Sequence, residues 1–304
     1  MILLSDFYKK IFGCKVYKVS LCASCSCPNR DGSKGFGGCI FCSQKGSGDF
    51  IAKSKSISEQ FINGKSLVEK KAKGRSVSNR VLYLPYFQSF SSTYGDFEIL
   101  KSEFLEALSM DGVAGLAIAT RADCLGERFI DFFSEISEKY FLQIELGLQT
   151  SNEKTGNVIN RCYTDRDYEN AIALLQNRLP SAHIVTHLIF GLPNENIEDM
   201  IDSVRFVCKV NNRKSDKKFF GIKITNLYVL KDTALEKLFL EKHFECLTQD
   251  EYFYALQKAL KLLPENAVLH RFTGDPPKKI ALAPEWALNK RKVLNEAKKL
   301  FMEQ

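Results

Sequence analysis

Short apolar segments alternate with amphipathic segments along most of this chain, and this alternation limits the folds open to it more than any other feature. Several of the apolar segments are nearly continuously hydrophobic, as parallel strands covered on both faces are. The candidate strands are residues 15–21, 80–87, 113–120, 141–148, 182–189 and 219–229. They predict a parallel sheet that is buried on both sides.

The intervals between these strands carry apolar residues at helical spacing. Such stripes begin at Phe97, Phe129, Tyr168 and Ile197, and each gives its helix one apolar face for packing on a sheet. A regular succession of strand, helix and strand implies right-handed crossovers. The sequence therefore predicts an α/β fold, a partial TIM-like (β/α)6 barrel in which reactive groups gather where strands end and loops begin.

From about residue 235 this rhythm changes. Thr248 and Glu251 have the spacing of a capping box that opens a helix, and a short strand at 268–272 and a last helix at 284–301 follow. The chain is thus expected to consist of a core at residues 1–234 and a C-terminal α/β extension at residues 235–304, packed on the side of the barrel.

The composition argues against an embedded or exported protein. Of the 304 residues, 45% are hydrophobic and 26% are charged. No apolar run approaches the roughly 18 residues needed to cross a bilayer. Only Ile2, Leu3 and Leu4 precede polar residues at the N-terminus, which is too short for the centre of a secretion signal. We therefore expect a cytoplasmic protein with no membrane partner.

A surplus of positive charge is concentrated in one segment. The chain has 43 basic and 36 acidic residues, a formal net charge of +7. Between residues 53 and 80, eight basic residues face only Glu59 and Glu69. The basic residues are Lys53, Lys55, Lys65, Lys70, Lys71, Lys73, Arg75 and Arg80. Such a segment is either the solvated face of a helix or a surface that follows a phosphate backbone.

Six of the ten cysteines crowd the first 42 residues. Three of them, Cys27, Cys39 and Cys42, lie on a glycine-rich loop at residues 27–42, after the first predicted strand. In a reducing compartment, disulfides are not expected. Three thiolates on one flexible loop can converge on a single inorganic centre. If that centre is a four-iron cluster, one iron lacks a protein ligand and is open for chemistry.

A structural zinc site is the alternative for this loop. Such a site needs a fourth ligand, which Cys22 or Cys25 would supply. The cysteines that are scattered singly through the rest of the chain are expected to be small buried hydrophobes. These are Cys124, Cys162, Cys208 and Cys246.

The cysteine loop carries a family resemblance. The run Cys27-Pro-Asn-Arg-Asp-Gly, followed by Cys39-Ile-Phe-Cys42, resembles the radical SAM superfamily, and its eleven-residue gap resembles the bacterial YhcC/YtqA-type branch related to the catalytic subunit of Elongator. Further segments resemble this branch in the same order along the chain. They include residues 83–94, 120–124, 145–150, 187–193, 221–223, 270–275 and 283–286.

This resemblance implies a chemistry. It implies a 4Fe–4S cluster held by Cys27, Cys39 and Cys42, with S-adenosylmethionine (SAM) chelating the open iron. Reduction of SAM then releases methionine and a 5'-deoxyadenosyl radical that abstracts hydrogen from a substrate. An electron donor of the flavodoxin or ferredoxin type is implied as a partner. By position, the residues that resemble contacts to SAM are Gln88, Gln149, Arg161 and His187.

Structural roles stand beside these functional ones. The guanidinium of Arg161 suits the carboxylate of SAM, whereas Gln88 can anchor its loop and His187 can be a satisfied core histidine. A carboxylate inside a strand, such as Glu145, requires a partner, for which Arg121 is one candidate. Other charged residues near strand ends face a substrate or form salt bridges. These are Asp123, Lys223, Lys231, Arg271 and Asp275, and Lys223 is a second candidate partner for Glu145.

The basic segment and the Elongator-like kinship both point to transfer RNA. We expect remodelling of the 5-substituent of a wobble uridine, from carboxymethylaminomethyluridine to aminomethyluridine, on a base that is unstacked into the barrel mouth. Two alternatives remain open: a radical SAM enzyme acting on a small molecule or a protein, and a zinc-stabilised RNA-binding module without catalysis. The sequence does not indicate an oligomeric state.

Overall fold

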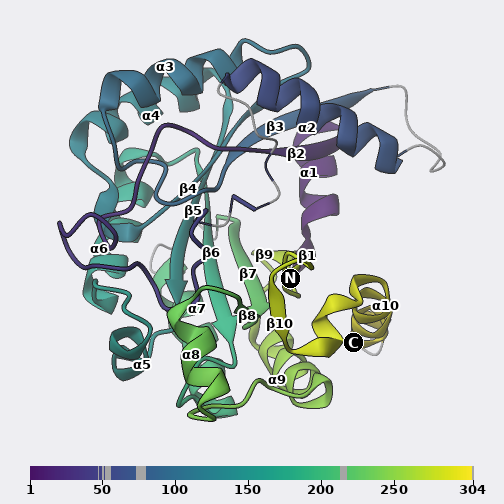
Figure 1. The fold of residues 1–304 in the computed structure, drawn as a ribbon. Helices are drawn as coiled ribbons and strands as arrows, with labels where there is room; N and C mark the ends of the chain where they lie inside the picture. The colour runs from purple at the N-terminus through teal and green to yellow at the C-terminus, as the bar shows by residue number, and fades with distance from the viewer. Residues whose placement is uncertain (47, 50, 52–55, 73–79, 213–217, 303–304) are drawn as a thin grey trace.

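Eight parallel strands form one curved sheet at the centre of the computed structural model (Figure 1). The structure describes residues 1–302 except 47, 50, 52–55, 73–79 and 213–217. In spatial order the strands are β1 (Ile2–Leu3), β9 (Ala267–Arg271), β7 (Phe220–Asn226), β6 (His183–Phe190), β5 (Phe141–Gln149), β4 (Gly115–Thr120), β3 (Val81–Phe87) and β2 (Lys15–Leu21). Strands β8 (Val229–Leu230) and β10 (Ala281–Ala283) form a separate antiparallel ribbon.

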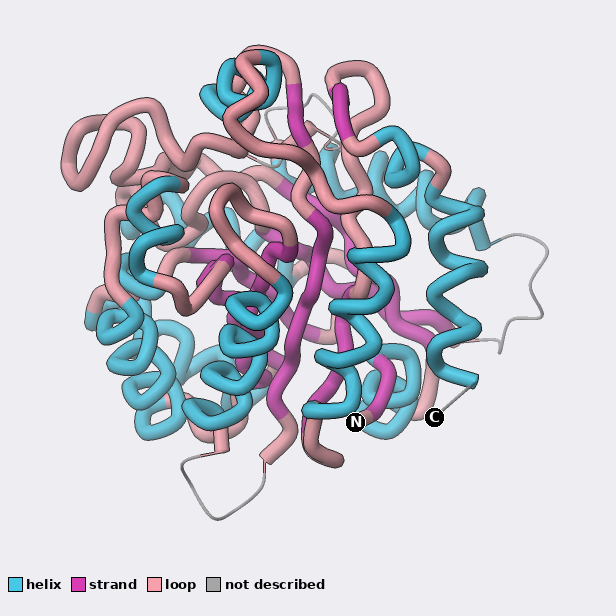
Figure 2. Tube along the Cα trace, turned by 90° about the horizontal axis from the view of Figure 1, so that it is seen from below, coloured by secondary structure: helices cyan, strands magenta, loops and turns pink. Residues whose placement is uncertain are grey.

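Helices surround the sheet (Figure 2). They are α1 (Leu4–Phe12), α2 (Ile57–Ala72), α3 (Phe97–Leu108), α4 (Glu127–Lys139), α5 (Glu153–Val158), α6 (Asp165–Arg178), α7 (Ile197–Asn211), α8 (Ala234–Leu240), α9 (Gln249–Leu262) and α10 (Lys290–Met302). Short 3₁₀ turns lie at 122–124 and 285–288. In the described part of the chain, no helix has the length and apolar character to cross a membrane.

The predicted fold class is confirmed, since each of the six predicted strands is present in a half-barrel sheet. The sheet has two strands more than the predicted set of six. β9, predicted as a short strand of the C-terminal region, pairs in parallel with β7, and β1 pairs with β9. Helix α1 was not predicted from the sequence.

The helices begin where their sequences allow capping, and their apolar stripes are buried. Thr164 and Thr248 both form complete capping boxes at the starts of α6 and α9, which satisfy backbone N–H groups that a helix start leaves unpaired. Helix α4 buries Phe129 and Phe133 against the sheet, and each such side chain contributes about 2 kcal/mol when it is removed from water. The stripes are therefore core, and the polar chemistry lies at the strand ends.

The basic segment lies partly on α2, which packs against β2. The ammonium group of Lys65 lies 3.7 Å from Asp111 and stacks over the ring of Tyr83. The predicted basic residues Lys53, Lys55, Lys73 and Arg75, and the side chain of Lys71, lie outside the described residues.

Candidate functional site

A cavity of about 300 Å³ opens at the carboxyl ends of the strands. Its lining comes from the cysteine loop after β2 and from the ends of strands β3 to β7 and β9. Parallel α/β folds place their reactive groups at this edge because successive strands end there and deliver their loops to one place. The cavity is therefore the candidate site.

The three predicted cluster cysteines line this one cavity. Cys27, Cys39 and Cys42 come from a single loop. Burial, reinforced by the neighbouring thiols, raises the pKa of Cys39 to about 12, and burial also raises the pKa of Cys42. Buried thiols that crowd one another resist ionisation until a cation is placed among them. Among the described residues, no three Cys, His, Asp or Glu side chains converge closely enough to hold a single metal ion.

Arg30 braces the cysteine loop from within. Its guanidinium donates to the carbonyl of Ser43 at 2.6 Å and lies over the ring of Phe90. Gly38 has a φ of 81°, in the left-handed region. It lies so close to the side chain of Arg30 that a Cβ at this position would be 3.0 Å from Nε of Arg30. Only glycine fits this backbone conformation and this approach without strain.

Asn29 fastens the loop to the segment that follows α5. It is fully buried, and its Nδ2 donates to the carbonyls of Asn160 (2.6 Å) and Arg161 (3.2 Å). The same amide lies 3.7 Å from Sγ of Cys39. Asn29 therefore both positions the loop and presents an N–H group to one of the thiols.

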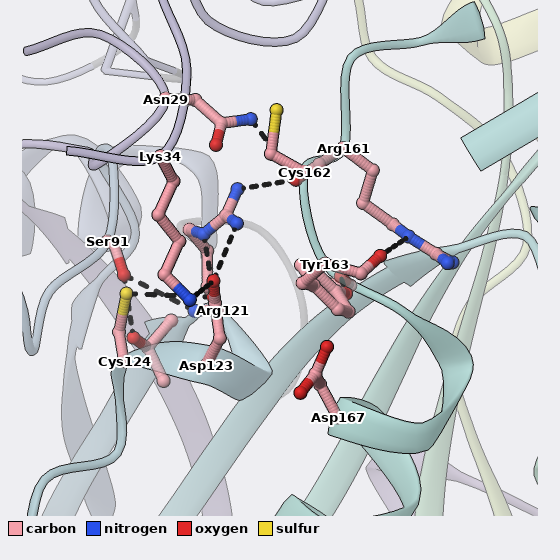
Figure 3. A network of polar contacts seen from close by, with 12 residues as sticks. Asn29, Lys34, Ser91, Arg121, Asp123, Cys124, Arg161, Cys162, Tyr163 and Asp167 are labelled. Carbon is pink, nitrogen blue, oxygen red and sulfur yellow. Dashed lines mark hydrogen bonds and ion pairs between the residues drawn. The ribbon is translucent and has the colours of Figure 1, made fainter. Parts of the chain in front are cut away.

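A second set of contacts joins the loop to the end of β4 (Figure 3). Arg121 holds Asp123 in a bidentate pair, with Nε at 2.8 Å and Nη2 at 2.9 Å, and donates from Nη1 to the carbonyl of Arg161. Lys34 of the cysteine loop lies 2.8 Å from the same carboxylate. Burial alone would raise the pKa of Asp123, but the two cations hold it below its usual range. We call Asn29, Lys34, Arg121, Asp123 and Arg161 the loop clamp.

Arg161 is not among the residues that line the cavity. Its side chain is 1% exposed, and its guanidinium nitrogens contact five internal oxygens. The acceptors are the carbonyls of Leu148, Thr150 and Tyr163 and the carboxylates of Glu153 and Asp165. The arginines that do line the cavity are Arg30, Arg121 and Arg271. In this structure Arg161 is engaged with the surrounding scaffold, and the contact with SAM that the sequence suggests for it stays a prediction.

The other three expected SAM contacts do line the cavity. Gln88 follows β3 directly. Gln149 ends β5 with a φ of 66°, at a point where the register between β5 and β6 shifts. A side chain on Gly147 would collide with the amide of Gln149. This β-bulge re-aims the side chain of Gln149, as bulges beside active sites commonly do.

The floor of the cavity is an ionic network built on five strands. Glu145, which is fully buried, accepts from Lys18 (2.5 Å), Tyr86 (2.6 Å) and His187 (2.7 Å) and also contacts Nζ of Lys223. We call these five residues the floor network. The expected partner Lys223 is present, whereas the other candidate partner, Arg121, pairs with a different carboxylate.

Burial and mutual charge set the protonation states in the floor network. Burial would raise the pKa of Glu145, but Lys18 and Lys223 hold it well below its usual range. Burial, only partly offset by Glu145, lowers the pKa of Lys223 to about 7. Burial and the charge of Lys223 lower the pKa of His187 to about 4. The imidazole is therefore neutral near pH 7, and its Nε2 is the donor to Glu145.

Sequence reasoning did not single out Asn29, Arg30 or Tyr86, and it considered Arg121 only as a partner for Glu145. Arg121 directly follows β4, which was a usable signal because strand ends deliver side chains to the site. Tyr86 lies within an apolar strand, where nothing in the local pattern marks it as polar.

Comparisons with known proteins show which family this chain resembles. A model of the radical SAM superfamily matches residues 27–207, and a model of the radical SAM C-terminal domain matches residues 220–303. The uncharacterized protein YtqA of Bacillus subtilis is 36% identical over 97% of this chain and 88% of its own length. YhcC of Escherichia coli is 29% identical over 92% of this chain and 85% of its own length.

A solved structure shows the same fold. The N-terminally truncated Elp3 of the archaeon Methanocaldococcus infernus aligns with a TM-score of 0.66 at 15% identity. The alignment covers 94% of this chain but 63% of that one, so this chain spans less than two thirds of the archaeal structure.

Radical SAM proteins use a 4Fe–4S cluster and SAM, and the residues of this cavity fit both groups. Three thiols from one loop face the cavity, and an amide N–H lies beside one sulfur, which is the kind of contact that tunes a cluster. Polar side chains at adjoining strand ends suit the charged and hydrogen-bonding groups of SAM. By sequence, fold and donor set, this chain belongs to the radical SAM superfamily, in its YhcC/YtqA-type branch.

Proposed function

We propose that this radical SAM enzyme remodels the 5-substituent of a wobble uridine in transfer RNA, converting carboxymethylaminomethyluridine to aminomethyluridine. The observation that carries the proposal is that the cysteine loop lines one cavity together with four residues of the floor network, Tyr86, Glu145, His187 and Lys223. A reactive centre held by the cysteines would share a chamber with strand-borne polar groups suited to a substrate. The expected kinship with Elongator supports transfer RNA as the source of that substrate.

The cysteine loop would hold the cluster through the thiolates of Cys27, Cys39 and Cys42. When bound, the cluster and SAM supply one-electron chemistry that generates a radical able to take a hydrogen atom from the substrate. Asn29 and Arg30 fix the loop so that the thiols stay on the cavity wall. A reductant of the flavodoxin or ferredoxin type would deliver the electron.

The strand ends would orient SAM and the substrate. Gln88 and Gln149 present amides that both donate and accept hydrogen bonds. His187 is held neutral and fixed by Glu145, so it offers a defined hydrogen-bonding edge rather than a charge. Because these side chains are on strands or directly after them, they are held more rigidly than side chains on long loops.

A nucleic acid would reach this cavity by presenting a single unstacked base. An anticodon loop offers such a base at low cost, because the base is already unpaired. The basic segment that includes α2 would contact the phosphate backbone around it, which makes the affinity depend on salt.

The cluster assignment is tested by Cys39→Ala. This variant should lose 5'-deoxyadenosine formation and the brown colour of the anaerobically purified protein, and it should retain the circular dichroism of the wild type. Cys208→Ala, which changes a cysteine of α7 outside the cavity lining, is the matched control and should form the product normally. Undiminished product formation by Cys39→Ala contradicts the assignment.

The substrate is tested by mass spectrometry of transfer RNA nucleosides from a strain that lacks this gene. We expect aminomethyluridine to disappear and carboxymethylaminomethyluridine to accumulate. Replacement of Lys70, Lys71 and Lys73 by alanine should weaken RNA binding and lower its salt slope by about 1 per lost phosphate contact. An unchanged nucleoside profile together with salt-insensitive binding would instead favour a small-molecule or protein substrate.

A further inference from the structure

Two cations stand side by side on the cavity wall formed by β7 and β9. Lys223 of β7 pairs in register with Arg271 of β9, and both line the cavity. The register shifts at this point: Ile222 pairs with Leu269, so His270 is bypassed and Arg271 is brought opposite Lys223. Without the irregularity the position opposite Lys223 would belong to His270.

Such an arrangement is unfavourable for the fold by itself. Like charges at directly paired strand positions repel one another, and bulges are used to re-aim side chains at functional sites. Burial, Lys18 and Arg271 all act to lower the pKa of Lys223, and Glu145 only partly opposes them. Lys223 is thus placed beside two other cations whose charge Glu145 only partly offsets.

The local charges do not balance. Glu145 is shared by Lys18 and Lys223. Asp275 is bonded by Lys290, and its carboxylate lies 3.8 Å from Nη2 of Arg271. Two carboxylates therefore face four cations, Lys18, Lys223, Arg271 and Lys290. A third carboxylate in the cavity lining, Asp49 of the cysteine loop, accepts a hydrogen bond from Ser43.

The guanidinium of Arg271 has an open donor edge. Its Nε donates to the carbonyl of Thr273 at 2.8 Å, and within the described residues its Nη groups have only the long ion pair with Asp275. The other two arginines of the lining, Arg30 and Arg121, donate to carbonyls and carboxylates of the surrounding loops. The Nη edge of arginine matches the two oxygens of a planar carboxylate.

We propose that Lys223 and Arg271 form a carboxylate-binding site that holds the substrate in this cavity. Arg271 donates from its two Nη groups, and the ammonium group of Lys223, which already bonds Glu145 and Tyr86, supplies a further donor from the adjacent strand. This inference deepens the proposed function and rests on it for the identity of the ligand: the carboxymethylaminomethyl substituent ends in a carboxylate.

Binding of ¹³C-labelled acetate to the cluster-loaded protein with SAM tests the proposal by NMR titration, at an ionic strength fixed with chloride. Wild-type protein should bind acetate saturably and more tightly than inorganic phosphate. Arg271→Gln and Lys223→Met should each weaken acetate binding by about tenfold or more, the effect of losing one charge-assisted pair. Arg271→Lys keeps the charge but loses the planar fork of the guanidinium. Its affinity for acetate should therefore lie between that of these variants and that of the wild type.

Arg205→Gln, on the exposed face of α7, is the control and should bind acetate as the wild type does. Because the side chain of Arg271 is half-exposed, we expect Arg271→Gln to fold. This variant therefore tests the proposal even if Lys223→Met folds poorly. Absence of saturable acetate binding, tighter binding of phosphate, or equal acetate affinity in Arg271→Gln overturns the proposal. Because acetate carries no nucleoside, an unchanged transfer RNA profile with retained acetate binding would reject the proposed function and leave this site intact.

Discussion

The floor network and the loop clamp bury charges beside the same cavity, but they balance them differently. In the clamp, Arg121 and Lys34 share Asp123, while Arg161 is matched by two carboxylates, so three cations meet three anions. In the floor network Glu145 alone faces Lys18 and Lys223. The clamp also uses backbone carbonyls as acceptors, whereas the floor uses side chains on strands.

This difference separates a structural device from a binding one. A balanced set of charges needs nothing further and serves to hold loops at fixed positions. An unbalanced set on rigid strands costs stability in the empty protein and is relieved when a ligand of opposite charge arrives. Single substitutions test this difference, because their effects on the free energy of unfolding should differ between the two regions.

The largest effect is expected for Glu145→Gln. The substitution leaves Lys18 and Lys223 buried without their carboxylate, and removal of one partner of a buried ion pair typically costs about 3–5 kcal/mol. The free energy of unfolding in urea measures this loss. Glu98→Gln removes the carboxylate of an exposed pair with Arg128 and should cost less than about 1 kcal/mol. Similar losses in the two variants would show that the buried carboxylate of Glu145 stabilises the fold no more than an exposed carboxylate does.

Arg161→Lys should be the next most damaging change. Lysine offers three donors without the planar fork, so at least two of the five internal acceptors lose their partners. We expect a loss of about 2–3 kcal/mol in the free energy of unfolding. Arg178→Lys, at an exposed pair of carboxylates, is the control.

The same variant separates the two roles considered for Arg161. If its function is to hold the scaffold, the affinity of the folded, cluster-loaded variant for SAM should stay within about twofold of the wild type. A tenfold loss of SAM affinity, which corresponds to about 1.4 kcal/mol, would instead support a direct contact between Arg161 and SAM.

Much of the fold could be predicted because its signals are local. A strand buried on both faces must be apolar along its length, so the six core strands stand out in the sequence. The pairing of β9 with β7 has no such signal, because strand order depends on contacts between distant segments. Helix α1 is amphipathic, but its residues were considered only as a possible targeting segment.

The site was predictable in its chemistry but only in part in its charge pairing, since Lys223 is an expected partner of Glu145 whereas the pairing of Arg121 with Asp123 is not. The spacing of Cys27, Cys39 and Cys42 marks them within one loop, and they do line one cavity. Arg121 directly follows β4 and Arg161 follows α5, and nothing in the local sequence shows which of the two guanidinium groups lines the cavity. A register shift of one residue at β9 likewise decides that Arg271 stands beside Lys223.

The pH dependence of stability should differ between wild type and Lys223→Met. The pKa of Lys223 is lowered in the folded state from 10.5 to about 7, so between these values the unfolded chain holds more protons than the folded one. Stability contributed by this group therefore rises with pH across that window, with a slope of at most about 1.4 kcal/mol per pH unit. Urea unfolding at pH 7, 8 and 9 should show this rise reduced in Lys223→Met. Parallel profiles would contradict the charge imbalance of the floor.

The smallest effect is expected for Lys34→Gln in the loop clamp. The contact with Asp123 raises the pKa of Lys34, but its side chain is 43% exposed and Arg121 still neutralises the carboxylate after the substitution. The loss in the free energy of unfolding should therefore be below about 1 kcal/mol. Lys18→Gln is the matched change in the floor network, where the side chain is 17% exposed and its carboxylate is fully buried. Its loss should be larger if burial of both partners sets the cost of losing the pair. An equal or smaller loss would mean that relief of the repulsion between Lys18 and Lys223 offsets the lost contact with Glu145.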